Sequence, residues 1–286
     1  MRLGLNWRPV ATPADLDDAL DLVDELGVGT VAAPPADAVC DWTVAEAREW
    51  GEAVRERGLT VGELGYWANL QGEAREERVE TLRGLLRRAD AMGAACVVGL
   101  VGSRAESAAD PHPDNYAEAF RDEVRDTCRA VLDGLELDRT RYVLEPWYNT
   151  FFHRPRPVRE FLDAVDDDRL GVHMDVANLH TLEDVHRSEA VVDRAFELLG
   201  DDVAAVHAKD LALVPGEGTD VVTIREVPPG EGALAYDDYL AAVDGLDPDV
   251  PVFTEHWADE GTYVETVRYL RDRAAGLGAT VRGRDA

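Results

Sequence analysis

The chain has 286 residues, of which 58 are acidic and 29 basic, so its formal net charge at pH 7 is −29. A surface this acidic repels phosphate backbones and anionic lipids, which disfavours nucleic acids and membrane surfaces as partners. Hydrophobic residues make up 45% of the chain, which excludes global disorder, and no apolar run resembles a signal peptide or a membrane span, so we expect a soluble cytoplasmic protein.

Short runs rich in apolar and β-branched residues recur along the whole sequence. They predict eight strands, at residues 2–6, 30–33, 60–64, 96–101, 142–146, 170–176, 203–208 and 252–256. Amphipathic stretches between them predict helices at residues 15–26, 44–57, 73–92, 115–132, 158–165, 188–199, 236–243 and 262–275. Thr12 before Pro13 and Thr43 before Glu46 indicate helix N-termini, and glycines such as Gly27 and Gly93 indicate helix ends.

Eight strand–helix repeats are typical of a parallel sheet that closes into a (β/α)₈ TIM barrel of the α/β class. An open doubly wound sheet is the alternative, but no glycine-rich dinucleotide turn follows the first strand. No linker interrupts the repeats, so we expect a single barrel domain over residues 1–277. The segment 278–286 is expected to be a frayed tail.

The charged residues are unusual in kind as well as in number. Lys209 is the single lysine among the 29 basic residues, and all the others are arginine. Abundant acids with almost no lysine are typical of proteins from a high-salt, halophilic cytoplasm, where salt screens the self-repulsion. Lys209 lies beside a histidine at a strand end, which favours a functional role for it.

Four consecutive predicted strands, the fifth to the eighth, each carry an ionisable residue near the carboxyl end. These residues are Glu145, Asp175, His207 and Glu255. Side chains alternate between the two faces of a strand. On the sixth strand Leu170, Val172 and Met174 form one apolar face, so residues 171, 173 and 175 point into the barrel, and the same parity turns the other three residues inward.

Three carboxylates that converge in an apolar barrel mouth would be strongly destabilised without a partner of opposite charge. A divalent cation resolves this conflict. Three oxygen ligands and one imidazole suit Mn²⁺, Mg²⁺, Co²⁺ or Zn²⁺. The sequence therefore predicts one divalent metal ion bound by Glu145, Asp175, His207 and Glu255.

This pattern, with the segment 207–210 (HAKD) and the later 228–232 (PPGEG), resembles the xylose isomerase-like TIM barrels and their sugar phosphate isomerase/epimerase group. The resemblance implies that the four residues bind one metal and that Glu145 and Glu255 are the catalytic acid and base. Many relatives carry a histidine three residues after the sixth-strand aspartate, where this chain has Asn178. An amide is a poorer transition-metal ligand, although it can still bind a substrate hydroxyl.

The resemblance implies an isomerase or epimerase, with a small sugar or related polyhydroxy carbonyl compound as the substrate and proton transfer through an enediolate. A dehydratase of a keto-polyol, such as an inosose, uses the same four residues and stays open. An abasic-site endonuclease is disfavoured because the second and third strands lack the additional histidines that such enzymes use. A non-catalytic sugar-binding barrel is a further alternative, and the sequence leaves homo-oligomerisation open.

Other residues near predicted strand ends are candidates for binding the substrate. Aromatic rings there can pack against the C–H face of a sugar, and polar side chains can bind its oxygens. His173, one layer below Asp175, is interpreted as a buried structural histidine. The candidate substrate-binding residues are Asn6, Trp7, Trp147, Asn178, His180, Lys209 and Trp257.

Overall fold

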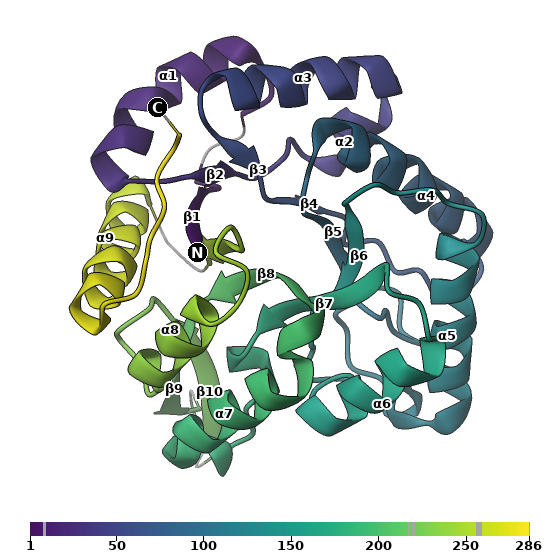
Figure 1. The fold of residues 1–286 in the computed structure, drawn as a ribbon. Coiled ribbons are helices and arrows are strands. Elements are labelled where there is room, and N and C mark those ends of the chain that lie inside the picture. The colour runs from purple at the N-terminus through teal and green to yellow at the C-terminus, as the bar shows by residue number, and fades with distance from the viewer. Residues whose placement is uncertain (8–9, 217, 219–220, 256–258, 286) are drawn as a thin grey trace.

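The computed structural model describes residues 1–7, 10–216, 218, 221–255 and 259–285. Its centre is a ring of parallel strands surrounded by helices (Figure 1). Neighbouring strands follow the order β3-β2-β1-β11-β8-β7-β6-β5-β4. They are β1 (Arg2–Leu5), β2 (Thr30–Val31), β3 (Thr60–Val61), β4 (Glu63–Gly65), β5 (Cys96–Gly99), β6 (Arg141–Leu144), β7 (Leu170–Asp175), β8 (Val203–Ala208) and β11 (Pro251–Thr254).

The two ends of this strand order, β3 and β4, together form one interrupted strand of the barrel. Only Gly62 separates them, and the chain there changes partner from β2 to β5. The Gly62 N–H donates to Val31 O, and the Ala95 N–H donates to Gly62 O, so hydrogen bonds continue across the break. With β3 and β4 counted as one strand, the barrel has the eight predicted strands, and the predicted (β/α)₈ barrel is confirmed.

The helices follow the strands much as the periodicity predicts. They are α1 (Pro13–Leu26), α2 (Ala36–Cys40), α3 (Val44–Glu56), α4 (Arg75–Met92), α5 (Glu118–Leu132), α6 (Pro155–Val165), α7 (Ser188–Leu199), α8 (Tyr236–Asp244) and α9 (Glu260–Leu277), with short 3₁₀ helices at Pro113–Tyr116, Ala177–Leu179, Asp184–Arg187 and Gly200–Asp202. Thr12 and Thr43 cap α1 and α3 in capping boxes with Asp15 and Glu46. The short helix α2 has no counterpart among the predicted elements.

The predicted alternation of β7 is also confirmed. Leu170, Val172 and Met174 belong to the large core between the sheet and the helices. The barrel interior contains a separate small cluster of Cys96, Val98, Val143 and Ala205. At the N-terminal half of the barrel Phe253 fills the space over Gly4 and Gly62, where an added Cβ would lie 2.1 Å and 2.6 Å from its ring. Above this apolar plug the interior becomes charged.

A β-hairpin of β9 (Asp210–Pro215) and β10 (Val222–Val227) extends directly from the end of β8. It occupies part of the long connection between β8 and α8. The buried Asp210 carboxylate accepts hydrogen bonds from the backbone N–H groups of Gly230, Gly232 and Leu234. This carboxylate therefore fixes the chain as it returns from the hairpin to α8.

The C-terminal tail differs from the frayed segment that the sequence suggests. After α9 it runs along the N-terminal ends of the strands, where the Arg282 N–H donates to Met1 O and the Asp285 N–H donates to Gly58 O. The Arg2 guanidinium donates to Gly283 O at 2.9 Å. The backbone hydrogen bonds hold described residues of the tail against the base of the barrel. No helix within the described ranges is long and apolar enough to cross a membrane.

Candidate active site

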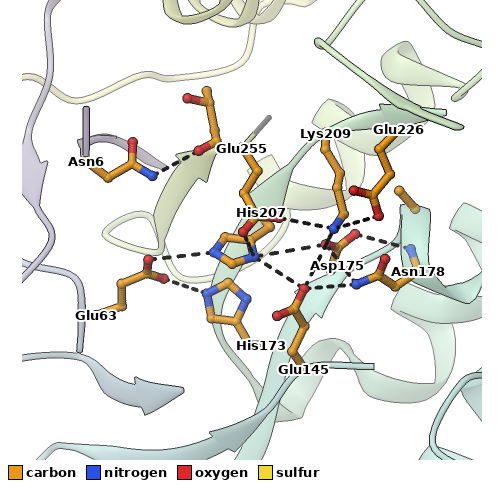
Figure 2. A network of polar contacts seen from close by, with 12 residues as sticks. Asn6, Glu63, Glu145, His173, Asp175, Asn178, His207, Lys209, Glu226 and Glu255 are labelled. Carbon is orange, nitrogen blue, oxygen red and sulfur yellow. Dashed lines mark hydrogen bonds and ion pairs between the residues drawn. The ribbon is translucent and has the colours of Figure 1, made fainter. Parts of the chain in front are cut away.

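The four predicted ligands converge at the carboxyl ends of four neighbouring strands. Glu145 directly follows β6, Asp175 ends β7, His207 lies in β8, and Glu255 directly follows β11. One ligand atom from each side chain lies within 4.8 Å of all the others, so the group could hold a metal ion. Glu145, Asp175 and His207 are buried, and the Glu255 side chain is 25% exposed. Figure 2 shows them grouped around one region of the barrel mouth.

The atom at the centre of this group is Nδ1 of His207. It lies 3.3 Å from Glu255 Oε1, 3.5 Å from Glu145 Oε1 and 4.0 Å from Asp175 Oδ2. The atom is buried and has no hydrogen-bond partner among the residues that the structure describes. Ligands with bonds of about 2.1 Å lie about 3.0–3.4 Å apart around an octahedral or tetrahedral cation. The donor set therefore fits a divalent cation: the Glu255 distance lies in this range, and the Glu145 and Asp175 oxygens lie slightly beyond it.

The charges in this cluster strongly affect one another. Burial raises the pKa of Glu145 to about 7, against the opposing effect of His207, and the negative charges of Glu255 and Asp175 add to the rise. Burial disfavours the charged form of His207, but Glu255 and Glu63 outweigh it and raise the His207 pKa well above its usual range. The carboxylates therefore need positive charge close by.

Lys209 supplies one positive charge. Its side chain is 2% exposed, and Nζ lies 2.7 Å from Asp175 Oδ2, 3.1 Å from Glu255 Oε2 and 3.3 Å from Glu226 Oε1. Burial opposes ionisation of Lys209, but these acids raise its pKa well above the ordinary lysine value. The ammonium thus occupies one side of the carboxylate group, as Figure 2 shows.

Asn178 lies directly against two of the acids. Its Nδ2 donates to Glu145 Oε1 at 2.9 Å and to Asp175 Oδ2 at 3.2 Å. Its buried Oδ1 has no hydrogen-bond partner within the described part of the chain. The amide thus orients two carboxylates and leaves one acceptor for another group.

The structure adds two acids that the sequence analysis does not identify. Glu226 reaches the site from β10 and contacts both Lys209 and the Tyr148 hydroxyl. Glu63 of β4 lies 2.7 Å from Nε2 of His173. The sequence signal for Glu63 is a glutamate inside an otherwise apolar strand between Gly62 and Leu64. Glu226 lies outside the eight predicted barrel strands, in the hairpin strand β10.

A cleft of about 570 Å³ lies beside this centre, at the mouth end of β1, β2 and β4. Its lining includes Asn6, Trp7, Glu63, Tyr66 and Trp67. The Asn6 Nδ2 donates to Thr254 O, and its buried Oδ1 has no partner among the described residues. Trp7 donates to Glu260 and stacks on Tyr263. The cleft thus combines polar groups with flat apolar surfaces, as sugar sites require.

Two other candidate substrate contacts do not line this cleft. His180 uses both ring nitrogens within the protein, one against Val176 O and one against the Ser188 hydroxyl, so neither nitrogen is left for a substrate. Trp147 packs on Tyr148 and its indole N–H donates to Ala109 O, so its polar group is used within the protein. Trp257 lies outside the described residues.

The model of the xylose isomerase-like TIM barrel family matches residues 20–273. This match covers the strands and loops that carry every ligand described above. The chain belongs to this family. Its resemblance to the xylose isomerase-like barrels, inferred from the four strand ends, is thereby confirmed.

Solved structures share the architecture of the family along almost the whole chain. A xylose isomerase-like TIM barrel protein from Mycobacterium smegmatis in complex with magnesium is 17% identical, with a TM-score of 0.68 and 97% of each chain covered. A D-psicose 3-epimerase determined in the presence of D-fructose is 15% identical, with a TM-score of 0.69 and coverage of 98% of this chain and 100% of that one.

The probable 3-DHS dehydratase AsbF from Bacillus anthracis is 14% identical, with a TM-score of 0.67 and coverage of 96% of this chain and 99% of that one. A search among curated proteins finds no significant match. At these identities the three structures show a common fold, and the reaction has to be argued from the site itself.

Proposed function

We propose that this protein is an isomerase or epimerase that depends on one divalent metal ion and acts on a sugar or a related polyhydroxy carbonyl compound. The observation that carries the proposal is the buried Nδ1 of His207, which faces the carboxylates of Glu145, Asp175 and Glu255 at ligand spacing. Mn²⁺, Mg²⁺, Co²⁺ and Zn²⁺ are all compatible with this donor set. The similarity to a magnesium complex and to a sugar epimerase supports the proposal.

A divalent cation bound there would polarise a substrate carbonyl and stabilise the negative charge that develops on neighbouring oxygens when an adjacent C–H is deprotonated. The proton itself is transferred by the protein. Glu145 and Glu255 follow β6 and β11, with β7 and β8 between them. Their carboxylates therefore approach the centre from two sides, and one can remove a proton that the other returns.

Other side chains of the mouth would bind the substrate. Lys209 can stabilise a developing oxyanion, and the acceptor oxygens of Asn6 and Asn178 can receive hydrogen bonds from hydroxyl groups. Trp7 offers a flat surface in the cleft beside the metal ligands. These groups suit a small, uncharged polyol that lies partly over the cation and partly in the cleft.

The second candidate reaction is dehydration of a keto-polyol. It begins with the same proton removal and then loses a hydroxide from the neighbouring carbon, so the same residues serve it. The similarity to a probable dehydratase favours keeping this candidate. The products separate the two reactions, because isomerases and epimerases retain all the oxygens of the substrate.

The test is incubation of the protein with a panel of ketoses and inososes in D₂O with Mg²⁺ or Zn²⁺, followed by NMR. We expect deuterium to enter at the carbon beside the carbonyl, without loss of water and only in the presence of the metal. A dehydrated product would assign the enzyme to the lyases. Binding of sugars with metal present, but without exchange for any compound of the panel, would contradict the proposal and favour a binding barrel.

A further inference from the structure

Glu63 is an acid of the barrel interior that the proposed mechanism does not use. It follows Gly62 at the break between β3 and β4, and its side chain is 10% exposed. In Figure 2 it lies on the far side of His207 from Glu145 and Asp175. An ionised carboxylate in such a place has to be compensated by specific partners.

Its partners are two imidazole rings. Oε2 of Glu63 lies 2.7 Å from Nε2 of His173, and Oε1 lies 3.6 Å from Nε2 of His207. The two rings are 3.9 Å apart, centroid to centroid, at an angle of 58°. Burial opposes ionisation of Glu63, but His207 and His173 outweigh it and lower its pKa to about 2. The carboxylate therefore accepts a hydrogen bond from His173 and faces Nε2 of His207 at ion-pair distance.

Which nitrogen of His207 can bind a metal depends on which nitrogen carries the proton. A neutral imidazole carries one N–H, and its other nitrogen has the lone pair that binds a metal. The three carboxylates around Nδ1 would by themselves draw the proton to Nδ1, where it blocks metal binding. The negatively charged Glu63 carboxylate lies on the opposite side of the ring, 3.6 Å from Nε2, and its charge favours the proton on Nε2.

We propose that Glu63 is a positioning residue that keeps the proton of His207 on Nε2 and directs Nδ1 at the cation site. His173 holds the Glu63 carboxylate in place through the 2.7 Å hydrogen bond. Groups that orient a metal-bound histidine in this way typically affect metal affinity 10- to 100-fold when they are removed. The inference rests on the proposed function, because it presumes one cation at Glu145, Asp175, His207 and Glu255.

The experiment measures cation binding in place of turnover. Metal-stripped wild type, Glu63→Gln, Glu63→Ala and His173→Gln are titrated with Zn²⁺ by calorimetry, and ¹⁵N NMR of the imidazoles reports which nitrogen of His207 binds the cation. Glu189→Gln, an exposed glutamate at the start of α7, is the control for loss of one negative charge. Circular dichroism and the melting temperature of each metal-free variant establish that it is folded.

We expect one cation per chain in the wild type, with His207 bound through Nδ1. Affinity should fall about 10-fold or more in Glu63→Gln, further in Glu63→Ala, and less in His173→Gln, with Glu189→Gln unchanged.

Two results would overturn this inference and leave the proposed function intact. One is wild-type cation affinity in folded Glu63→Gln. The other is a second cation that the Glu63 and His173 variants lose, because Glu63, His173 and His207 could themselves hold an ion. A wild type that binds no cation would overturn the proposed function and the inference with it.

Discussion

The two ends of the barrel use charge in opposite ways. At the mouth, four carboxylates share one ammonium, that of Lys209, and three of the side chains involved are almost fully buried. At the base, the buried Arg2 guanidinium meets Asp249 and Asp285, whose side chains are 50% and 75% exposed. Buried, unevenly matched charges destabilise a fold, whereas a buried arginine satisfied on all sides supports it.

This difference indicates that the mouth is built for chemistry and the base for stability, as expected for the two faces of a (β/α)₈ barrel. It also gives the sign of each effect. Substitutions at the mouth should change activity and cation binding while leaving the metal-free fold intact or more stable. Substitutions at the base should change the free energy of unfolding alone.

The largest effect is expected for the two proposed proton-transfer residues. Glu145→Gln and Glu255→Gln should each lower turnover by about 10³-fold, since an amide cannot exchange the substrate proton. The metal-free variants should melt at or above the wild-type temperature, because each substitution removes a negative charge from a crowded acidic cluster. Turnover is measured at saturating metal, and melting is measured after metal removal.

Glu189→Gln again serves as the control, since it removes a glutamate from the exposed outer surface of α7. It should behave as the wild type in both measurements. A Glu145→Gln or Glu255→Gln variant with bound metal and full turnover would show that the proton is transferred by another group. A marked loss of metal-free stability would contradict the comparison between mouth and base.

The next effect in size concerns Lys209, which shares its carboxylate partners with the proposed cation. Lys209→Met should bind the cation about tenfold more tightly or better, because two unit charges 4 Å apart repel by about 4 kcal/mol at an effective dielectric constant of 20. Turnover should fall about 10²-fold if the ammonium stabilises a developing oxyanion. Calorimetry and steady-state kinetics on the same preparations separate these changes.

Weaker cation binding in Lys209→Met would mean that the ammonium orders the carboxylates and does not compete with the metal. An unchanged turnover would remove Lys209 from the substrate-binding groups. Competition is expected because Nζ lies 2.7 Å from Asp175 Oδ2, which is itself a proposed ligand atom.

Much of the fold follows from the sequence because local signals agree with one another. The period-2 pattern of β7 places His173 and Asp175 on the inner face, and the capping boxes at Thr12 and Thr43 begin α1 and α3 where predicted. Parity along the strands also brings Glu145, Asp175, His207 and Glu255 together. A closed barrel fixes which strand ends are neighbours, so this part of the site needs no long-range information.

The remaining features depend on contacts between distant segments. Glu63 is a single acid in a short strand, and its role becomes visible only when His173 and His207 lie beside it. His180 looks like a substrate contact in the sequence, but Ser188 and the Val176 carbonyl take up its ring nitrogens. The tail, with its glycine and arginine residues, has no periodicity, and its order comes from partners near the opposite end of the chain.

The smallest effect is expected at the base. In Arg2→Ala the free energy of unfolding of the metal-free protein should fall by about 2 kcal/mol. The substitution removes the hydrogen bonds that the guanidinium donates to Asp249, Asp285 and the Gly283 carbonyl. Arg284→Ala, which removes an exposed pair with Asp24, should have a much smaller effect and is the matched control in the same tail. Cation affinity should be unchanged in both.

The Arg2 effect should depend on pH. The guanidinium of Arg2 lowers the pKa of Asp249 in the folded protein, chiefly through their hydrogen bond. This contribution is complete above the unfolded-state pKa of about 3.9 and is lost as the pH falls through the folded value. Denaturation at pH 7 and near pH 3.5 should therefore show the gap between wild type and Arg2→Ala narrowing in acid. A difference in the free energy of unfolding that stays constant with pH would assign the Arg2 contribution to the hydrogen bond with the neutral Gly283 carbonyl. The ion pairs at the base would then contribute little to stability.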